Sequence, residues 1–374
     1  MEIDTVHRGR RSTRHRSALP TGGARGVAAA ALVFLANLTA CAGDPERESL
    51  GGVAIVERLA IGAAIGDASE EFGHLVDVRS ADDGSIFVLD VQGPTIRWYG
   101  PEGALRGEIA STGEGPGELA SATAIAVYDS RRLAVVDPDN GRISLYRFGD
   151  DGLAYDSQIA QGLSAFNTGG RSVCSIGDRL FLRELRDDLL IHELDATGRI
   201  VRSFEAATST SDDEFGPYAD IVAPQLNAGH LLCLEEPGMI VSMSRYLPTV
   251  RAFTPDGSLL WETELTNFRP WRITATPEAG VTYQVDPING SHLGVSISRW
   301  DRTNLLLQYA VSPRPGMPED RDYFAIESRV ISIASGRDVG WLDGLPLVVE
   351  TSGNRLYSFE NRPFPRVRVL ERSE

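Results

Sequence analysis

Six carboxylates recur along the chain, each at the end of a short apolar run: Asp90, Asp137, Glu184, Glu235, Asp286 and Glu350. Carboxylates bind divalent metals and transfer protons in catalysis, so their chemistry has to be considered first. A catalytic group is needed once, whereas a carboxylate that accepts backbone N–H groups across a turn is needed in every copy of a repeated unit. We therefore expect the six to be structural, and we predict no catalytic residue, cofactor site or metal site.

Four histidines lie beyond the N-terminal forty residues: His74, His192, His230 and His292. None belongs to an HExxH zinc motif, and the GxSxG motif of serine hydrolases is absent from the sequence. We expect each histidine to pack within a strand or to lie at the surface.

The spacing of the six carboxylates indicates the fold. They are separated by 47, 47, 51, 51 and 64 residues, which is typical of a four-stranded β-propeller blade. After each carboxylate the chain makes a turn and begins a second apolar run. The sequence thus predicts an all-β protein, a six-bladed β-propeller of four-stranded antiparallel blades over residues 53–374. Val53–Ile61 should pair with the last blade around Arg366–Leu370 and leave no bare sheet edge.

The N-terminus predicts export. Six arginines precede an apolar stretch from Val27 to Leu38, which is too short to span a bilayer as a helix. It ends in Leu38-Thr-Ala-Cys41, which resembles the lipobox of bacterial lipoproteins. The resemblance implies that residues 1–40 are a lipoprotein signal peptide and that acyl chains on Cys41 anchor the protein. With Ala42 next, it implies the periplasmic face of the outer membrane. An ordinary secretory signal is the alternative.

Residues 41–52 are predicted to form the lipidated cysteine and a flexible tether, because they are polar and rich in glycine. Removal of residues 1–40 takes away six arginines and two acids, so the net charge falls from −16 to −20. That charge makes nucleic acid an unsuitable partner. The absence of lysine excludes Schiff-base chemistry and a P-loop lysine.

Two cysteines remain in the predicted mature chain after Cys41. We expect Cys174 on the first strand of one blade and Cys233 on the second strand of the next. The periplasm permits a disulfide, but two small buried apolar residues are the favoured interpretation.

One loop carries a specific resemblance. Gly113-Glu-Gly-Pro-Gly-Glu-Leu119 is similar to the G-x-GPGEF loop between the first two blades of six-bladed, NHL-repeat-like propeller lipoproteins of Gram-negative bacteria. The loop precedes a predicted strand and holds two glutamates, so we interpret it as a rigid turn rather than a phosphate cradle. The resemblance implies the fold and says little about function.

Segments that depart from the repeat are the candidate binding surfaces. They are an enlarged connection at 235–248, the run Phe268–Arg272 and an extension from Ser312 to Phe324. Long loops that carry aromatic, methionine and arginine residues on a rigid scaffold often form binding sites. The predicted ligand-binding residues, which could hold a carboxylate-bearing or aromatic ligand, are Tyr218, Arg245, Tyr246, Trp271 and Arg272. Packing loops without a partner are the alternative.

These features predict a monomeric, membrane-anchored periplasmic propeller. It would act as a non-catalytic binding or scaffold module for a protein, peptide or cell-envelope ligand. The alternatives are a metal-dependent hydrolase or lyase, similar to lactonases, with its site in the central channel, and a structural part of an envelope assembly. Three or more carboxylate, Asn or His side chains converging in the channel would favour the enzyme, and Arg, Tyr and Trp would favour binding.

Overall fold

The computed structural model describes residues 49–67, 70–109, 111–163, 171–210, 215–276, 280–312 and 325–373. The predicted signal peptide, Cys41 and residues 313–324 of the predicted extension lie outside these ranges. The last four residues of the predicted tether form a strand, β1 (Ser49–Gly52). Within the described ranges, no helix has the length and apolar character needed to cross a bilayer.

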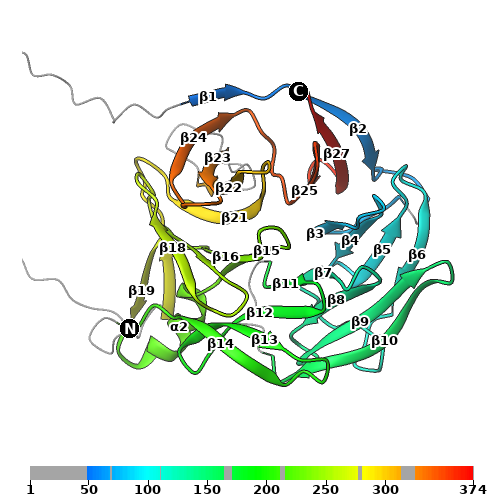
Figure 1. Cartoon of the computed structure of the whole chain (residues 1–374), viewed down its shortest axis with the longest axis horizontal. Helices are drawn as coiled ribbons and strands as arrows, with labels where there is room; N and C mark the ends of the chain where they lie inside the picture. The colour runs from blue at the N-terminus through cyan, green and yellow to red at the C-terminus, as the bar shows by residue number, and fades with distance from the viewer. Residues whose placement is uncertain are drawn as a thin grey trace, which may run out of the picture. The chain divides into compact units, whose positions relative to one another are not determined.

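The described strands form seven sheets, six of which are the blades of a ring (Figure 1). Blade 1 contains β3 (Leu75–Ser80), β4 (Ile86–Asp90), β5 (Thr95–Tyr99) and β6 (Leu105–Ile109). Blade 2 contains β7 (Ala124–Tyr128), β8 (Arg132–Asp137), β9 (Arg142–Gly149) and β10 (Gly152–Gln161). Blade 3 contains β11 (Val173–Ile176), β12 (Arg179–Arg186), β13 (Leu189–Leu194) and β14 (Ile200–Ala206).

Blade 4 contains β15 (Gly229–Leu234), β16 (Met239–Ser244), β17 (Thr249–Phe253) and β18 (Leu259–Glu264). Blade 5 contains β21 (His292–Arg299), β22 (Asn304–Val311), β23 (Ala325–Ser332) and β24 (Asp338–Asp343), with β1 added in parallel at its outer edge. Blade 6 contains β25 (Glu350–Ser352), β26 (Arg355–Glu360), β27 (Arg366–Arg372) and β2 (Ile55–Ile61). The predicted six-bladed propeller of antiparallel blades is confirmed.

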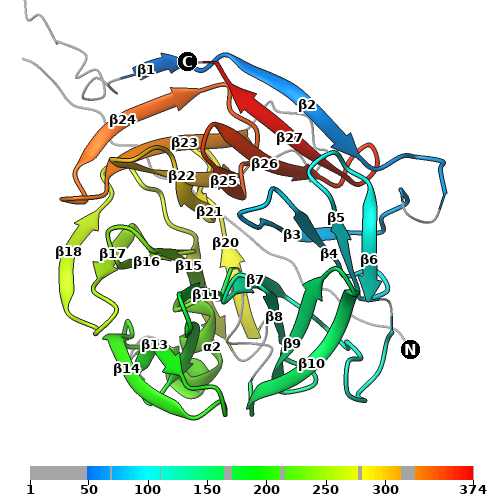
Figure 2. The same ribbon diagram turned by 45° about the vertical axis from the view of Figure 1, so that its right-hand side comes forward.

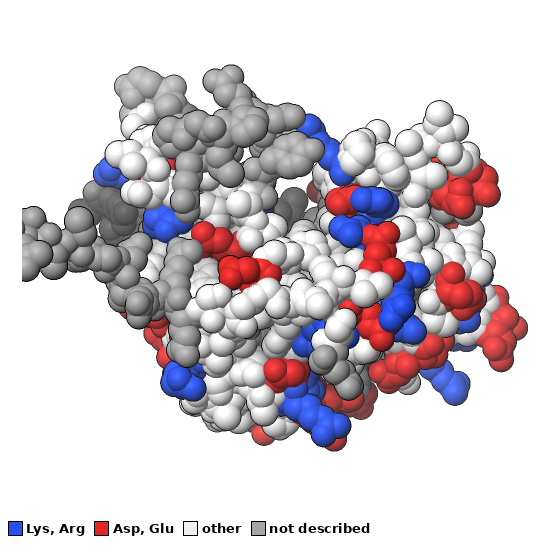
Figure 3. Space-filling model, turned by 90° about the horizontal axis from the view of Figure 1, so that it is seen from above, with Lys and Arg blue, Asp and Glu red and all other residues white. Residues whose placement is uncertain are grey.

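The N-terminal strand closes the ring, as the sequence predicts. β2 pairs antiparallel with β27, from Ile55 opposite Arg372 to Ile61 opposite Val367. Ion pairs of Arg58 with Glu371 and of Arg368 with Glu57 join the two strands. Figure 3 shows acidic and basic residues interspersed on the side of the molecule in view. Figure 2 shows the outermost strands along the rim.

Each inner strand contacts the inner strands of the two neighbouring blades, so β3, β7, β11, β15, β21 and β25 surround the centre (Figure 1). The blades pack face to face, and alternate residues of one strand enter different cores. On β4, Ile86 and Val88 pack towards blade 6, whereas Phe87 and Leu89 pack towards blade 2. Both faces of the sheet are therefore covered, which explains why the apolar runs are continuous rather than alternating.

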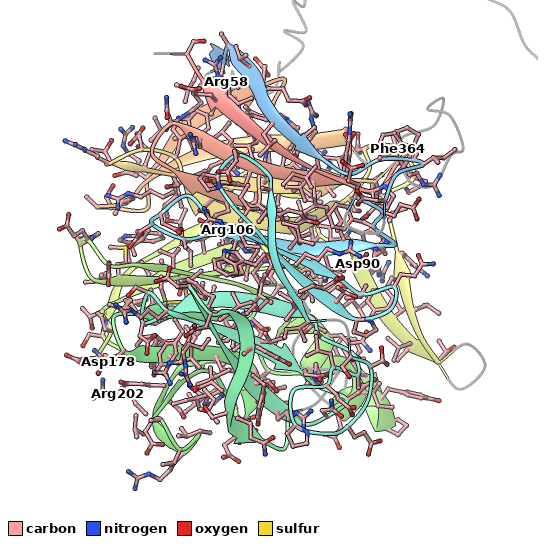
Figure 4. The ribbon with its side chains drawn as sticks, turned by 90° about the vertical axis from the view of Figure 1, so that its right-hand side faces the viewer. Arg58, Asp90, Arg106, Asp178, Arg202 and Phe364 are labelled. Carbon is pink, nitrogen blue, oxygen red and sulfur yellow. A yellow bond between two sulfur atoms is a disulfide. The ribbon has the colours of Figure 1, made fainter. Side chains whose placement is uncertain are left out.

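Consecutive strands are antiparallel, so their connections alternate between the two faces of the ring. We call one the Asp90 face, which carries the turns between second and third strands and the connections between blades. The other, the Asp178 face, carries the remaining turns. In the edge-on view of Figure 4, Asp90 and Phe364 lie towards one side and Asp178 and Arg202 towards the other.

An accessory layer is inserted beside blade 4 on the Asp90 face. It consists of a 3-10 turn (Gly216–Tyr218), α2 (Ala219–Leu226), the hairpin of β19 (Arg272–Thr276) and β20 (Gly280–Gln284), and the turn at 285–290 that follows the hairpin. Helix and hairpin share a small core, formed by Phe215, Ala219, Val222 and Ile273. The connections on both sides of blade 4 thus fold together, although more than forty residues separate them.

Two sequence predictions about blade 4 and its neighbours are wrong. Residues 235–248 are not one enlarged connection, because Met239–Ser244 is the fully buried strand β16. The six carboxylates do not all occupy one position of the repeat. The first three lie on second strands, whereas Glu235 follows the innermost strand β15, Asp286 follows the accessory hairpin, and Glu350 begins the innermost strand β25. The predicted number of six blades is correct, but the predicted order of the strands along blades 4 to 6 is shifted.

Candidate functional site

Two of the six carboxylates bind the backbone of the connection that leads into their own blade. Each accepts two consecutive N–H groups, which lie 17 and 16 residues earlier in the chain. The bonds run from Gly73 and His74 to Asp90, at 2.6 and 2.8 Å, and from Ala120 and Ser121 to Asp137, at 3.1 and 2.8 Å. Asp286 likewise accepts the N–H groups of Ile288 and Asn289. The structural interpretation is confirmed for these three.

We expect Asp137→Ala to lower the unfolding free energy by about 2–4 kcal/mol, because two N–H groups lose a charged acceptor inside the protein. Asp137 is fully buried, so water cannot replace it. Chemical unfolding followed by circular dichroism measures the change. Asp286→Ala is the matched control, because its carboxylate caps an exposed turn. Equal losses in the two variants would contradict this role for Asp137.

The loop Gly113–Leu119 is held as a turn, as predicted. The buried Arg142 guanidinium donates to the carbonyl oxygens of Glu114, Gly115 and Glu118, at 3.0, 2.6 and 2.9 Å. The loop's carbonyl groups thus face a cation from blade 2, which fixes the inter-blade connection.

A charged network occupies the centre of the ring, and the sequence did not predict it. Arg171, in the connection into blade 3, donates to the Glu350 carboxylate at 2.8 Å and lies 3.6 Å from that of Asp77. Its backbone N–H donates to Nδ1 of His230 at 3.2 Å, and its guanidinium reaches the Ile297 carbonyl at 3.4 Å. A single arginine thus touches blades 1, 4, 5 and 6.

A second arginine completes the network. Arg79 of blade 1 donates to the Ile125 carbonyl of blade 2 at 2.6 Å and to Glu350 at 3.1 Å, and lies 3.3 Å from Asp77. Asp77 in turn accepts the N–H group of Ile125 at 3.0 Å. All six blades therefore meet in one network, in which Arg171 stands at the entry to blade 3. The bonds of the two guanidinium groups to carboxylates and carbonyl oxygens replace the hydration that buried charges lose.

Burial raises the pKa of Asp77 to about 6 and outweighs the charge of Arg171, which lowers it. Burial also raises the pKa of Glu350. An aspartate of the unfolded chain titrates near 3.9. The folded protein therefore binds this proton more tightly, so the contribution of Asp77 to stability is complete below about pH 4 and is lost as pH rises through about 6.

Asp77→Asn, which cannot ionise, should therefore gain stability relative to the unsubstituted protein as the pH rises from 4.5 to 7.5. Unfolding free energies of both proteins at several pH values give this difference, in which the titration of other groups cancels. Parallel pH profiles would show that Asp77 does not titrate in this window.

The channel groups do not form the metal-ligand constellation of the enzyme hypothesis. The Asp77 and Glu350 carboxylates are bonded to Arg79 and Arg171, so guanidinium groups occupy the positions that a cation would take. The described residues include no group of three His, Cys, Asp or Glu side chains arranged to hold a metal ion. The arginines match the channel composition that favours binding, although no Tyr or Trp takes part in these contacts.

The histidines lie as the sequence predicts. His74 is exposed, and the other three are buried in strands. Burial lowers the pKa of His230 to about 3, so its ring is neutral, accepts the Arg171 N–H at Nδ1 and donates from Nε2 to the Gly294 carbonyl at 3.0 Å. His292 accepts the Arg269 N–H at 2.8 Å and lies 3.1 Å from Glu327.

All five predicted ligand-binding residues lie on the Asp90 face, in connections next to blade 4. Arg245 and Tyr246 form the turn between β16 and β17, Tyr218 precedes α2, and Trp271 and Arg272 lead into β19. The Arg245 guanidinium lies 5.9 Å from the centre of the Tyr246 ring. Within the described residues, no hydrogen bond, ring contact or cation–π contact joins Tyr218 or Trp271 to that pair.

Sequence reasoning missed the exposed apolar residues of the accessory layer. Tyr283 of β20 stacks on Tyr246, with ring centres 5.9 Å apart, and connects the layer to the predicted residues. The exposed large apolar side chains are Ile221, Tyr283, Val285 and Ile288. The sequence concealed the hairpin, because the apolar run that ends at Asp286 was counted among the six repeated runs of the blades.

The preferred interpretation of the cysteines is wrong. Cys174 and Cys233 form a disulfide. Cys174 lies on a first strand, β11, as predicted, but Cys233 lies on the first strand of blade 4, β15, rather than on a second strand. The error follows from the shifted phase of blade 4. With the correct phase, the two residues lie side by side at the junction of blades 3 and 4.

Comparison with known proteins identifies the fold alone. No protein-family model and no curated protein matches the chain. Among solved structures, a putative exported protein from Bacteroides fragilis has 10% identity and a TM-score of 0.54, covering 87% of this chain and 99% of its own. A member of a family of unknown function from Bacteroides vulgatus has 9% identity and a TM-score of 0.52, covering 86% and 99%.

Virginiamycin B lyase from Staphylococcus aureus has 9% identity and covers 85% of this chain and 99% of its own. Its TM-score of 0.49 is too low to support an inference. The chain therefore shares its fold with the two Bacteroides proteins, and its function has to be inferred from its own residues.

Proposed function

We propose that this protein is a non-catalytic binding module of the cell envelope, tethered through acylated Cys41. Its partner is a protein or peptide that docks on the accessory layer of the Asp90 face. Eight residue steps separate Cys41 from Ser49, so the anchor would hold the ring within about 28 Å of the bilayer. The resemblance of Leu38–Cys41 to a lipobox supports the anchor.

The observation that carries the proposal is the exposure of apolar side chains on the accessory layer. Ile288 is 74% exposed and Ile221 51% exposed, although the layer has a core of its own. Exposed apolar residues on neighbouring elements that pack together are typical of protein-interaction surfaces. The exposed Arg272, at the start of the hairpin, supplies a cation for a carboxylate of the partner.

Other exposed large apolar residues of the described chain do not form such an element. Apart from Ile65, they lie on outer or edge strands around the ring: Leu50, Val56, Leu105, Val201, Leu259 and Leu260. Because these strands belong to different blades, the residues are dispersed around the rim. The accessory layer is accordingly the best-supported docking surface.

Photocrosslinking in cells tests this surface. A photoreactive amino acid at position 288 of the full-length protein should give one discrete crosslinked partner, and Arg272→Glu in the same protein should weaken the product severalfold. The control carries the photoreactive residue in place of Leu259, which is 55% exposed on β18. Equal products at both positions, or none at position 288, would overturn the proposal.

A further inference from the structure

A pocket of about 1300 Å³ lies on the Asp178 face, where the turns of blades 4, 5 and 6 meet. One part of its wall is apolar: Pro237, Met239, Trp300, Ile333 and Ala334. Another part holds three arginines: Arg299, Arg302 and Arg372. A concave surface that combines apolar walls with a few convergent charged groups is typical of a small-ligand site.

The three arginines have no carboxylate partner within 4 Å in the described part of the chain. Most arginines on strands elsewhere in the ring pair with an acid, as Arg179 does with Glu193 at 2.7 Å. In the pocket the bonds run to carbonyl oxygens instead, from Arg299 to Asp301 and from Arg372 to Gly353, each at 3.0 Å. Their positive charges are therefore available to a ligand.

Among the three arginines, the charge of Arg372 is the least compensated by its surroundings. Its guanidinium lies 4.2 Å from the centre of the Trp300 ring, and its Nε atom is buried without a hydrogen-bond partner in the described structure. Burial lowers the pKa of Arg372, and the nearby charge of Asp301 only partly opposes this. The guanidinium has thus lost hydration that no carboxylate replaces.

The two acids of the pocket do not cancel the three arginines. The Asp301 carboxylate already accepts hydrogen bonds from the backbone and side chain of both Thr303 and Asn304. Glu236 is exposed at the turn between β15 and β16. The pocket therefore keeps a local excess of positive charge in a protein whose net charge is −16.

We propose that this pocket binds an amphipathic organic carboxylate. Its carboxylate pairs with the arginines, Arg372 and Arg302 foremost, because a guanidinium fork matches the two carboxylate oxygens. Its apolar body packs against Trp300, Met239 and Ile333. The site lies on the face opposite to the accessory layer and is independent of the proposed docking surface.

Calorimetric titration of the purified 42–374 protein tests the proposal with two probes of one shape. We expect naphthalene-2-carboxylate to bind at least tenfold more tightly than the neutral naphthalene-2-carboxamide. Raising sodium chloride from 0.05 to 0.5 M should weaken the binding of the carboxylate severalfold. Equal affinity of the two probes, or no binding of the carboxylate at millimolar concentration, would overturn the proposal.

Substitutions locate the site. Arg302→Gln and Arg372→Gln should each lower the affinity for naphthalene-2-carboxylate at least fivefold. Arg302 is exposed, so its substitution leaves the fold intact. Arg199→Gln, at an exposed turn of blade 3, is the matched control and should change nothing. Ile288→Asp should also leave affinity unchanged, and a loss there would place the probe on the accessory layer and refute the pocket.

Discussion

Replacement of Arg171 by methionine should lower the unfolding free energy by about 3–5 kcal/mol, one of the two largest effects that we expect in this protein. Methionine keeps the length of the side chain and removes its charge. The carboxylates of Asp77 and Glu350 would lose the guanidinium of Arg171, at 3.6 and 2.8 Å, and would share the single remaining cation, that of Arg79. Breaking a buried pair by removing one partner is strongly destabilising, because the remaining charge stays dehydrated.

Chemical unfolding at pH 7 measures this loss. The matched control is Arg199→Met, whose guanidinium pairs with Asp195 at 3.1 Å but is 78% exposed, so that its removal should cost less than about 1 kcal/mol. Arg171→Lys keeps a charge but loses the fork, and should fall between the two. If Arg171→Met were no less stable than the control, the network would not hold the blades together.

Loss of the disulfide should have an effect of similar size. Cys174 and Cys233 are 59 residues apart, and opening a loop of that length removes about 4 kcal/mol of stabilisation in the chain-entropy description. The double variant Cys174→Ala/Cys233→Ala should therefore unfold at a lower denaturant concentration than the oxidised protein. The bond joins the innermost strands of two neighbouring blades, so the ring should open first at that junction.

A reductant separates the contribution of the disulfide bond to stability from the contribution of the packing of the two side chains. Dithiothreitol should destabilise the unsubstituted protein almost to the level of the double variant and should leave the double variant unchanged. An unsubstituted protein that unfolds identically with and without reductant would show that the thiols are not paired in solution.

The architecture could be predicted from the sequence because it rests on local, repeated patterns. A run such as Ile86–Asp90 is fully buried and continuous, since blades cover both of its faces. A structural role for Asp90 and Asp137 could be predicted for the same reason, because the carboxylate recurs with the repeat, but the N–H groups that both accept lie 16 and 17 residues earlier and were not predicted. The pairing of β2 with the last blade could be predicted because an unpaired sheet edge is unfavourable.

The centre of the ring could not be predicted, because its contacts are not local. Arg171 and Glu350 are 179 residues apart and belong to no motif. The run Met239–Ser244 was misassigned because methionine and serine are common both in binding loops and in buried strands. That error moved Cys233 to the wrong strand and concealed the disulfide.

The candidate surface combines predicted residues with others that the sequence did not indicate. Arg245, Tyr246 and Arg272 lie on one face, and the exposed apolar side chains belong to an insertion whose second strand was counted as one of the repeated runs of the blades. Only the packing of α2 on β19 and β20 shows that this hairpin lies outside the blades. Exposure of Ile288 and Ile221 is a property of the tertiary structure, and no sequence pattern contains it.

The most direct test of the proposed function is hydrogen exchange of the protein with and without the partner that crosslinks at position 288. The account predicts slower exchange in α2, in β19 and β20 and in the turn 245–248, with unchanged exchange in turns of the Asp178 face such as 177–178. Protection on the Asp178 face or along the channel strands, with none in the accessory layer, would contradict it.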